Sequence, residues 1–366
     1  MKQTSYLLVS MLIIGIGCGP AKKATRYADK SVTANIRSEG FFDCFEKGLT
    51  AGGQPVWCEA SAILFDGTKI LLANDKDMPD NRSSVFYWPF LNGFADTSRG
   101  STYLTEPAFK KAKKFEDFAF TPDGKLIFLS TAFDRIKPDS RDWNGYNTIF
   151  YWQTGEENMP TVLTDGAPDT TSISLRDRFS KTLRNTAFPN GVPYFKIEGL
   201  AATNDMLYFG IREEGKKFDD FTYQFKILAV NYTYSNKRVE LGKNIRVLAD
   251  IDLKTRYPDL EKGMGISSIE FDRFNNRFLM LSSFEGTDKM GGYLWTATLE
   301  ELGKNQVHLV KDEQGKPLAF HHKPEDLTSI NTNRILVIHD DDRMITKNGN
   351  QTRQSNQAAY SVVDFK

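Results

Sequence analysis

The segment Phe115-Glu-Asp-Phe-Ala-Phe-Thr-Pro-Asp-Gly-Lys-Leu-Ile-Phe-Leu-Ser130 consists of an apolar run, a Pro-Asp-Gly turn and a second apolar run. Two short apolar runs around such a turn are typical of a β-hairpin. Both runs are almost continuously apolar instead of alternating, so we expect both faces of this hairpin to be covered by other parts of the chain.

Four more copies of this hairpin unit occur in the chain, at residues 58–75, 197–212, 266–282 and 324–339. A third strand is expected after each hairpin and a fourth after the first four, which gives a period of roughly 60 to 80 residues. Four-stranded sheets repeated in this way are typical of a β-propeller. The sequence therefore predicts an all-β fold with a single β-propeller, in which five blade repeats are visible and the ring has five or six blades.

The last repeat shows only three strands before the chain ends. A propeller ring closes when one end of the chain completes the blade that the other end leaves unfinished. We therefore expect a strand from residues 26–50 to complete the last blade, so that the N-terminal segment closes the ring. The propeller domain is predicted to span residues 35–366.

Two segments interrupt the repeat pattern. Residues 164–195 show no strand pattern, but the spacing of Leu175, Phe179 and Leu183 predicts a short helix between Ser174 and Thr186, laid over one face of the ring. A structureless surface loop is the alternative. Residues 343–357 are almost entirely polar and are expected to form a mobile loop.

The N-terminus has the features of a signal peptide. Lys2 precedes the apolar run 6–17, which is too short to span a bilayer. Gly15-Ile-Gly-Cys18 is similar to a bacterial lipobox, although Gly15 replaces the usual Leu. Residues 1–17 are thus expected to be a lipoprotein signal peptide, Cys18 the lipidation site and residues 18–34 a tether, with a plain secretory signal as the alternative.

These features predict a location in the bacterial cell envelope, where the protein is lipid-anchored and faces the periplasm or the cell surface. Its contact with the membrane would then be made only through Cys18. The formal net charge is +0, which gives no indication of a nucleic acid partner. We expect a monomer.

The other two cysteines, Cys44 and Cys58, are expected to form a disulfide in this oxidising compartment. The bond would tie the N-terminal segment to the first inner strand. A zinc site is disfavoured because neither cysteine has another Cys or a His nearby at ligand spacing.

Four of the five repeats carry a glutamate near the start of their first strand, and we align these glutamates at one register: Glu59, Glu116, Glu198 and Glu325. The remaining repeat has Ser267 or Ser268 there. The start of the first strand and the end of the second lie at the same edge of a hairpin. If the first strands line the axis, the four glutamates converge around one mouth of the channel.

Clustered carboxylates are costly unless they are protonated, paired with basic groups or bridged by a hard cation. A divalent cation is therefore expected, with calcium as the first candidate. Its predicted ligands are Glu59, Glu116, Glu198, Glu325 and Asp340. The basic groups placed to compensate the carboxylates are Lys76, Arg135, Arg212 and Arg343.

Structural explanations exist for the same residues. Each glutamate could accept backbone N–H bonds from the neighbouring blade and act as a repeated lock between blades. The run Asp340-Asp341-Asp342 could be a solvated acidic loop, and at least one of the adjacent His321 and His322 is expected to be an ordinary surface residue.

Several enzyme signatures are missing from the sequence. It has no Gly-x-Ser-x-Gly elbow, no His-Glu-x-x-His motif, no phosphate-binding loop of the Walker type and no dinucleotide fingerprint. A serine hydrolase mechanism is disfavoured because no elbow presents a serine to any of the four histidines.

The segments Ile197-Glu-Gly-Leu-Ala and Leu207-Tyr-Phe-Gly-Ile-Arg212 resemble the phytase-like propeller superfamily, which includes esterase-like members. Lys323-Pro-Glu-Asp-Leu and Ile338-His-Asp-Asp-Asp342 look like the last blade of that family. The resemblance implies a six-bladed ring, and calcium ions and basic residues that hold phosphate.

Two functions are consistent with these features. The first is a metal-dependent hydrolase of an anionic ester, such as a phosphoester, in which the metal polarises the ester and activates water. Its expected catalytic residues are Glu198, Glu325, Arg212 and Arg135, and the two arginines would hold the anion. The second is a non-catalytic propeller that binds a small anionic ligand or an envelope protein, because the fold alone does not decide between them.

Overall fold

The computed structural model describes residues 32–91, 93–137, 139–286 and 289–366. The expected signal peptide, the lipidation site Cys18 and most of the tether lie outside these residues. Within the described part of the chain, no helix has the length and apolar character needed to cross a membrane.

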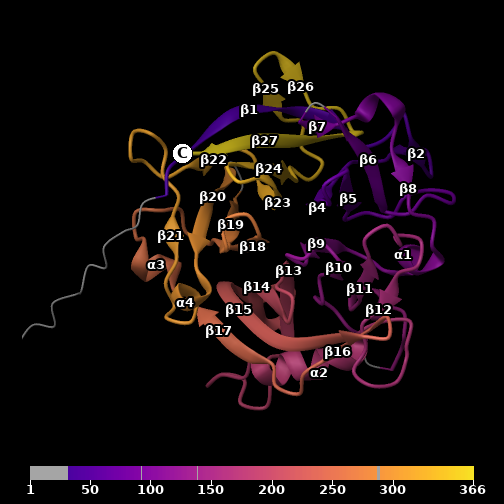
Figure 1. Ribbon diagram of the computed structural model, residues 1–366, viewed down its shortest axis with the longest axis vertical. Coiled ribbons are helices and arrows are strands. Elements are labelled where there is room, and N and C mark those ends of the chain that lie inside the picture. The colour runs from indigo at the N-terminus through magenta and orange to yellow at the C-terminus, as the bar shows by residue number, and fades with distance from the viewer. Residues whose placement is uncertain (1–31, 92, 138, 287–288) are drawn as a thin grey trace, which may run out of the picture. The chain divides into compact units, whose positions relative to one another are not determined.

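Five antiparallel sheets are arranged as the blades of a propeller (Figure 1). Their outer strands vary in length from two to ten residues. The inner strands are β4 (Ala60–Phe65), β9 (Phe115–Phe120), β13 (Tyr194–Ala202), β18 (Gly265–Asp272) and β23 (Pro324–Asn331). The second strands are β5 (Lys69–Asn74), β10 (Leu126–Thr131), β14 (Met206–Lys217), β19 (Arg277–Glu285) and β24 (Arg334–His339). We number the blades 1 to 5 in the order of these strands.

The third strands are β6 (Val85–Leu91), β11 (Ile149–Gln153), β15 (Asp220–Ser235), β20 (Met290–Ala297) and β27 (Gln357–Phe365). The outer strands are β8 (Thr102–Tyr103), β12 (Thr161–Val162), β17 (Arg246–Asp250), β21 (His308–Leu309) and β1 (Ala34–Asp43). Five short strands extend the blades or form a small separate hairpin: β7 (Phe94–Ala95), β16 (Arg238–Leu241), β22 (Ala319–Phe320), β2 (Thr50–Ala51) and β3 (Gln54–Pro55). The predicted order of strands within each repeat is confirmed.

The N-terminal strand closes the ring, as predicted. β1 pairs antiparallel with β27, from Ala34 opposite Phe365 to Asp43 opposite Gln357, and so completes blade 5. The inner strands contact one another in the cyclic order β4, β9, β13, β18, β23 and back to β4. The ring therefore has five blades, and the six-bladed alternative is wrong.

The hydrophobic core is divided into five clusters, one at each interface between neighbouring blades. In the cluster between blades 1 and 2, for example, Leu71 and Val85 pack with Ile127 and Phe150. Every inner and second strand thus buries both of its faces, which explains why these strands are apolar throughout instead of alternating.

The insertion between blades 2 and 3 contains the predicted helix, α2 (Ile173–Thr182). Phe179 on its buried side contacts Phe133 and Phe209, so the helix joins the core between these two blades. The structureless alternative is therefore wrong. The other helices are single turns: α1 (Pro107–Lys111), α3 (Leu253–Arg256), α4 (Leu299–Leu302), η1 (Thr97–Arg99) and η2 (Asn144–Tyr146).

The polar segment 343–357, which was predicted to be a mobile loop, contains a short hairpin and a buried arginine. It forms a small hairpin from β25 (Lys347–Asn348) and β26 (Gln351–Thr352). Arg353, which follows this hairpin, is buried, and its guanidinium donates to the carbonyl oxygens of Cys58, Asp342 and Gln357. A buried arginine cannot be recognised in a run of polar residues, so the sequence did not reveal this anchor.

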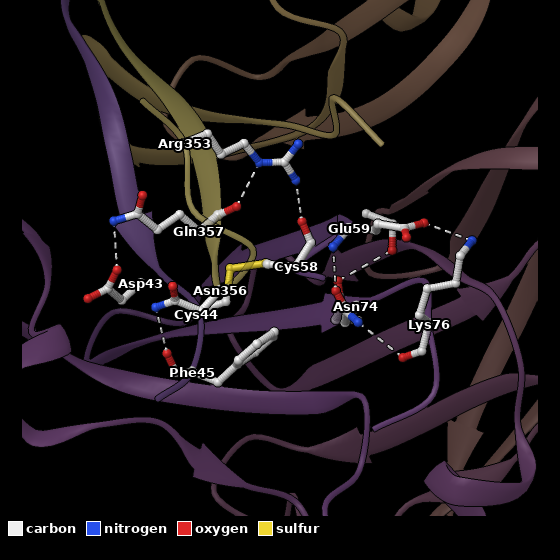
Figure 2. Close-up of a disulfide and its surroundings, with 12 residues drawn as sticks. Asp43, Cys44, Phe45, Cys58, Glu59, Asn74, Lys76, Arg353, Asn356 and Gln357 are labelled. Carbon is white, nitrogen blue, oxygen red and sulfur yellow. Dashed lines mark hydrogen bonds and ion pairs between the residues drawn. A yellow bond between two sulfur atoms is a disulfide. The ribbon is translucent and has the colours of Figure 1, made fainter. Parts of the chain in front are cut away.

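The predicted disulfide between Cys44 and Cys58 is present. It joins the segment after β1 to the segment before β4, and therefore links the closing strand of blade 5 to blade 1 (Figure 2). Backbone N–H groups of both cysteines donate to the chain between β26 and β27, at Asn356 and Ser355.

Candidate functional site

Each inner strand has a β-bulge at the same level, near one mouth of the ring. At each bulge one residue has no partner on the second strand, and the pairing resumes at the next residue. The five unpaired residues are Ser61, Glu116, Glu198, Ser267 and Glu325. Bulges commonly redirect side chains next to functional sites. Here they place three glutamates and two serines at one level of the ring.

The register that we expected for Glu59 is wrong. The bulge residue of blade 1 is Ser61, so Glu59 lies two residues before the level of Glu116, Glu198 and Glu325. The misalignment arose because the turn between Phe65 and Ile70 is two residues shorter than the turn between Phe120 and Ile127, so similar turn sequences do not place the two inner strands at the same level. Of the two serines expected at this register, Ser267 is the one at the bulge, level with Glu116, Glu198 and Glu325.

Two residues before each bulge glutamate stands a lysine, which was not among the predicted site residues. These lysines form the motif Lys-x-Glu at Lys114, Lys196 and Lys323, and Glu59 occupies the same register in blade 1. Each lysine lies near its glutamate at the mouth: Lys196 binds Glu198, and the Nζ atoms of Lys114 and Lys323 lie 3.8 Å and 2.8 Å from Glu116 and Glu325. The recurrence of Lys-x-Glu in three repeats was the signal that could have identified them.

Each of these lysines lies between two carboxylates. Lys196 Nζ binds Glu198 and lies 3.6 Å from Glu116 Oε1. Lys323 Nζ lies 2.8 Å from Glu325 and 3.2 Å from Glu285. These ammonium groups compensate the clustered glutamates.

The third lysine, Lys114, connects the bulge of blade 2 to the loop that follows β10. Its Nζ lies 3.8 Å from Glu116 and 3.0 Å from Asp134. Among the described residues, Oε1 of Glu116 is buried and accepts no hydrogen bond. The mouth therefore contains a buried carboxyl oxygen with cations nearby but no bonded partner.

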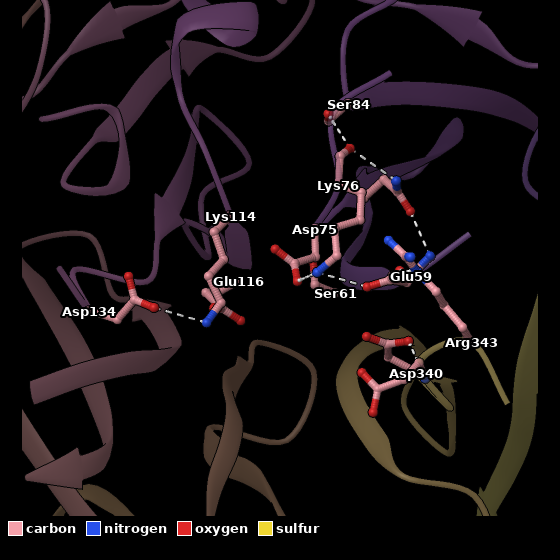
Figure 3. A network of polar contacts seen from close by, with 12 residues as sticks. Glu59, Ser61, Asp75, Lys76, Ser84, Lys114, Glu116, Asp134, Asp340 and Arg343 are labelled. Carbon is pink, nitrogen blue, oxygen red and sulfur yellow. Dashed lines mark hydrogen bonds and ion pairs between the residues drawn. The ribbon is translucent and has the colours of Figure 1, made fainter. Parts of the chain in front are cut away.

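Glu59 forms a separate group with residues from blades 1 and 5 (Figure 3). Its carboxylate binds Lys76 at 2.8 Å and Arg343 at 3.1 Å. One carboxylate oxygen each from Glu59, Asp340 and Asp342 lie within 4.8 Å of one another, and this is the cluster of possible metal ligands found among the described residues. Of the expected cation ligands, Glu59 and Asp340 are brought together, whereas Glu116, Glu198 and Glu325 pair with lysines.

The two arginines that we expected to hold an anion differ in their positions. Arg135 is partly exposed, and its Nε and Nη2 bind both carboxylate oxygens of Asp134. Arg212 is buried; Nη1 lies 3.1 Å from Glu198 and donates to the hydroxyl of Ser283. Arg212 and Glu198 therefore lie behind the surface that Arg135 helps to form.

A cavity of about 530 Å³ occupies the mouth. Its charged walls include Glu116, Glu325, Lys114, Lys196 and Lys323. Aromatic side chains form much of the remaining wall: Tyr146, Tyr194, Phe218, Phe221 and Tyr223. Lys76, Arg135 and Asp340 also line the cavity, whereas Glu59, Glu198 and Arg212 do not. The site is thus a pocket of mixed charge with one aromatic side.

The carboxyl groups of this site differ in proton affinity. Burial raises the pKa of Glu116 well above its usual range, and burial also raises the pKa of Glu325 despite the nearby Lys323. Burial opposes ionisation of Glu198 as well, but Arg212 and Lys196 outweigh it and lower the pKa of Glu198 to about 2. Neighbouring carboxyl groups with diverging pKa values are a feature of acid–base sites.

The expected lock between blades exists, but the residue after the glutamate provides it. Asp117 and Asp326 each follow a bulge glutamate and are buried. They accept bonds from other blades: Asp117 from the N–H groups of Leu200 and Ile269, and Asp326 from the N–H group of Ile63 and the hydroxyl of Ser268. The aspartates hold the ring together, which leaves Glu116 and Glu325 available for the cavity.

The acidic run after β24 is not a solvated loop, because Asp340 and Asp341 are buried. Asp341 accepts bonds from His322 at 2.6 Å and from the hydroxyl of Thr346 at 2.8 Å. Burial lowers the pKa of the adjacent His339 to about 3, so this imidazole is neutral. We assign these contacts to the architecture of blade 5.

No protein-family model and no curated protein matches this sequence. Several solved structures have a similar fold. They include the catalytic domain of a GH62 α-L-arabinofuranosidase from Coprinopsis cinerea, with 10% identity, 92% of this chain and 97% of that chain covered, and a TM-score of 0.46. A putative glycoside hydrolase from Parabacteroides distasonis has 11% identity, coverage of 88% and 97%, and a TM-score of 0.41.

A third similar structure is a member of the GH130 family, which contains glycoside hydrolases that target β-1,2 mannosidic linkages in Candida mannan. It has 9% identity, coverage of 92% of this chain and 94% of that chain, and a TM-score of 0.43. The present chain is a five-bladed β-propeller, and its chemistry has to be argued from its own residues.

Proposed function

We propose that the mouth cavity binds a small anionic ester and hydrolyses it. We also propose that the protein is a lipoprotein of the cell envelope. The observation that carries the proposed hydrolysis is the convergence of the three lysines of the Lys-x-Glu motifs, with Glu116 and Glu325 from the β-bulges, on one cavity of about 530 Å³. Lys114, Lys196 and Lys323 supply positive charge for the anion. Phosphoesters are the first class to test because of the phytase-like sequence segments.

In this proposal Glu325 and Glu116 contact the substrate. Their raised pKa values favour the protonated form, which a general acid needs in order to protonate a leaving oxygen. Glu285 also lines the cavity, and Lys323 lowers its pKa, so it is the ionised partner that could accept a proton from water. Arg135 would bind the anion from the rim.

Glu198 and Arg212 act as positioning residues in this mechanism, because they do not line the cavity. Glu198 holds Lys196, and Arg212 holds Glu198. Loss of either would misplace the Lys196 ammonium group without removing a group that touches the substrate. This assignment replaces the directly catalytic roles that we expected from the sequence.

A divalent cation in this site would be held by Glu59, Asp340 and Asp342. Three carboxylates are the hard oxygen ligands that calcium or magnesium prefers, and the positions of their oxygens fit one ion. Such an ion would add a positive charge at the edge of the cavity and polarise a bound ester. Lys76 and Arg343 already bind Glu59, so the ion would have to compete with them.

A second candidate function is ligand binding without catalysis. It is favoured by the fact that each glutamate at the mouth already has at least one basic group near it. The same cavity would then recognise a small anion or a segment of an envelope protein. The distinction between the two functions lies in turnover, because both predict binding.

The test is a turnover assay of the purified protein with 4-nitrophenyl phosphate and 4-nitrophenyl acetate, with and without calcium. Hydrolysis that falls at least tenfold in Glu325→Gln, but not in the exposed control Glu240→Gln, is the expected result. Inorganic phosphate should also raise the melting temperature, and Glu59→Gln should abolish any further increase caused by calcium. Stabilisation by phosphate without turnover favours the binding function. If the protein shows neither turnover nor stabilisation by phosphate, both proposed functions are overturned.

A further inference from the structure

A second cavity adjoins the mouth on the side of blades 2 and 3. It has a volume of about 280 Å³. Asp134, Arg135, Tyr194 and Phe218 line both this cavity and the mouth cavity, so the two are adjacent. The second cavity is therefore close enough to take a second chemical group of a ligand held in the mouth.

The second cavity is apolar on one side. Ile136 and Trp143 come from the loop between β10 and β11, and Phe218 lies at the tip of the β14–β15 hairpin. These side chains are unusually exposed for large apolar groups, at 41%, 43% and 71%. Exposed apolar groups gathered beside a polar pocket often mark a binding surface, because a bound group removes them from water.

Positive charge dominates the other side of this cavity. The single carboxylate of Asp134 faces Arg135, Lys114 at 3.0 Å and the nearby buried Arg176. Arg176 donates to the carbonyl oxygens of Phe133 and Pro193 and to the side chain of Asn147, and has no carboxylate partner among the described residues. The two lysines of the hairpin that line this cavity are already paired with Asp219 and Asp220.

Arg135 is the basic group best placed to meet a ligand. Its guanidinium stacks on the ring of Tyr146 with 4.4 Å to the centroid. Nε and Nη2 bind Asp134, and within the described residues Nη1 makes no hydrogen bond or ion pair. This nitrogen is thus available to a carboxylate at the boundary between the two cavities.

We propose that the second cavity is a subsite for an aromatic carboxylate group of the ligand. The aromatic ring would lie against Trp143 and Phe218, and its carboxylate would bind Arg135. Aromatic side chains pack favourably with other rings, and a guanidinium group binds a carboxylate strongly. An aromatic carboxylate therefore suits both the apolar side and the basic side of the second cavity. The inference rests on the proposed function in placing the remainder of the ligand in the mouth. There Lys114, Lys196 and Lys323 hold the anionic ester, and Arg135 at the rim holds the carboxylate of the same ligand.

The test uses benzoate as the probe and ligand-observed NMR of the full-length protein. We expect saturable binding with a dissociation constant on the order of 1 mM, as is usual for so small a ligand. Cyclohexanecarboxylate, which lacks the aromatic ring, and benzyl alcohol, which lacks the charge, should each bind at least tenfold more weakly. Trp143→Ala and Arg135→Met should weaken benzoate binding by a similar factor.

Leu299→Ala is the matched control, because Leu299 is similarly exposed and lies on α4, away from these cavities. It should leave benzoate binding unchanged. The proposal is overturned if benzoate does not bind saturably, if cyclohexanecarboxylate binds equally well, or if Trp143→Ala and Arg135→Met retain full affinity. These outcomes do not depend on ester hydrolysis, so failure of the subsite can be distinguished from failure of the proposed function.

Discussion

Asp117 and Asp326 share a hydrogen bond although their strands, β9 and β23, belong to blades 2 and 5, which are not neighbours in the ring. Together with their bonds to other blades, the two carboxyl groups connect all five inner strands. Both side chains are buried, and two ionised carboxylates in contact would repel each other strongly. The pair is therefore stable only when it holds a proton.

Asp117 is the better carrier of this proton. Its Oδ2 accepts the N–H groups of Leu200 and Ile269, which leaves Oδ1 for the proton shared with Asp326. Asp117→Asn should retain this arrangement, because the amide oxygen can accept the two N–H groups while the NH₂ group donates to Asp326. Asp117→Ala should leave two buried N–H groups without a partner and lower the free energy of unfolding by roughly 3 kcal/mol.

Urea unfolding measures this difference. Asp177→Ala, at an exposed position on α2, is the control and should change the free energy of unfolding by less than about 0.5 kcal/mol. Equal stability of the Asn and Ala variants at position 117 would contradict the assigned role, because only the Ala variant removes the acceptor.

The aspartate pair should also make stability depend on pH. Burial raises the pKa of Asp326 to about 7 and raises the pKa of Asp117, whereas both groups titrate near 4 in the unfolded chain. Between pH 4 and pH 7 the folded protein therefore binds more protons than the unfolded chain. The contribution of the pair to stability is fully present below about pH 4 and is lost as the pH rises through 7.

This contribution can be isolated by comparing the wild type with Asp117→Asn at pH 5 and pH 8. Other buried carboxyl groups, including the nearby Glu270, titrate in both proteins and cancel in the difference. The wild type should lose more stability than the variant over this range, because the variant has no carboxyl group at position 117 that binds a proton on folding. Parallel pH profiles of the two proteins would show that the pair does not carry a shared proton.

The disulfide should contribute substantially to stability. Cys44 and Cys58 are separated by 14 positions in the sequence. The loop-entropy model predicts that a disulfide closing a loop of this size raises the free energy of unfolding by about 3 kcal/mol. Replacement of both cysteines by serine should lower the free energy of unfolding by about that amount. The bond holds β1 next to blade 1, so the closing strand should lose its protection first.

Amide hydrogen exchange can follow that local effect. Protection in β1 should fall more than in β10, which has no connection to the disulfide. A uniform loss of protection over all blades would mean that the bond stabilises the ring as a whole and not its closure.

The fold could be predicted from the sequence because its signal is repeated. Each hairpin has the same apolar runs and turn, and five copies reinforce one another, so strand order and ring closure followed. The cysteine pair and the helix near Phe179 were also recognised, since each depends on residues close in sequence. The number of blades could not be decided until the paired strands were counted.

The site was predicted less well because it depends on features that spacing does not reveal. The turns of the first two hairpins differ in length by two residues, and only the strand pairing shows that Ser61, not Glu59, stands level with Glu116. The lysines were not predicted, although Lys-x-Glu recurs in three of the five repeats. The contact between Asp117 and Asp326 joins distant repeats and had no local signal at all.

Lys196 offers the most direct test of how the mouth compensates its charge. Its ammonium group binds Glu198 and lies 3.6 Å from Glu116, and all three residues are largely shielded from water. Lys196→Met keeps most of the side-chain volume but removes the charge. Loss of one member of a buried charged group typically costs about 3 kcal/mol, so the free energy of unfolding at pH 7 should fall by roughly that amount.

The loss should be smaller at pH 5 than at pH 8. Without Lys196, the pKa of Glu116 in the folded protein should rise even further. The folded variant then keeps a proton on Glu116 at pH values at which the unfolded chain, with a glutamate pKa near 4.5, has already released it. The stability of the variant should therefore decrease more steeply with rising pH than that of the wild type.

The control Lys181→Met removes an exposed lysine of α2 that pairs with Asp177, and should cost less than about 0.5 kcal/mol at either pH. A loss at Lys196 that is equal at pH 5 and pH 8 would indicate missing packing contacts, and the lysine would then not be the group that neutralises the glutamates of the mouth.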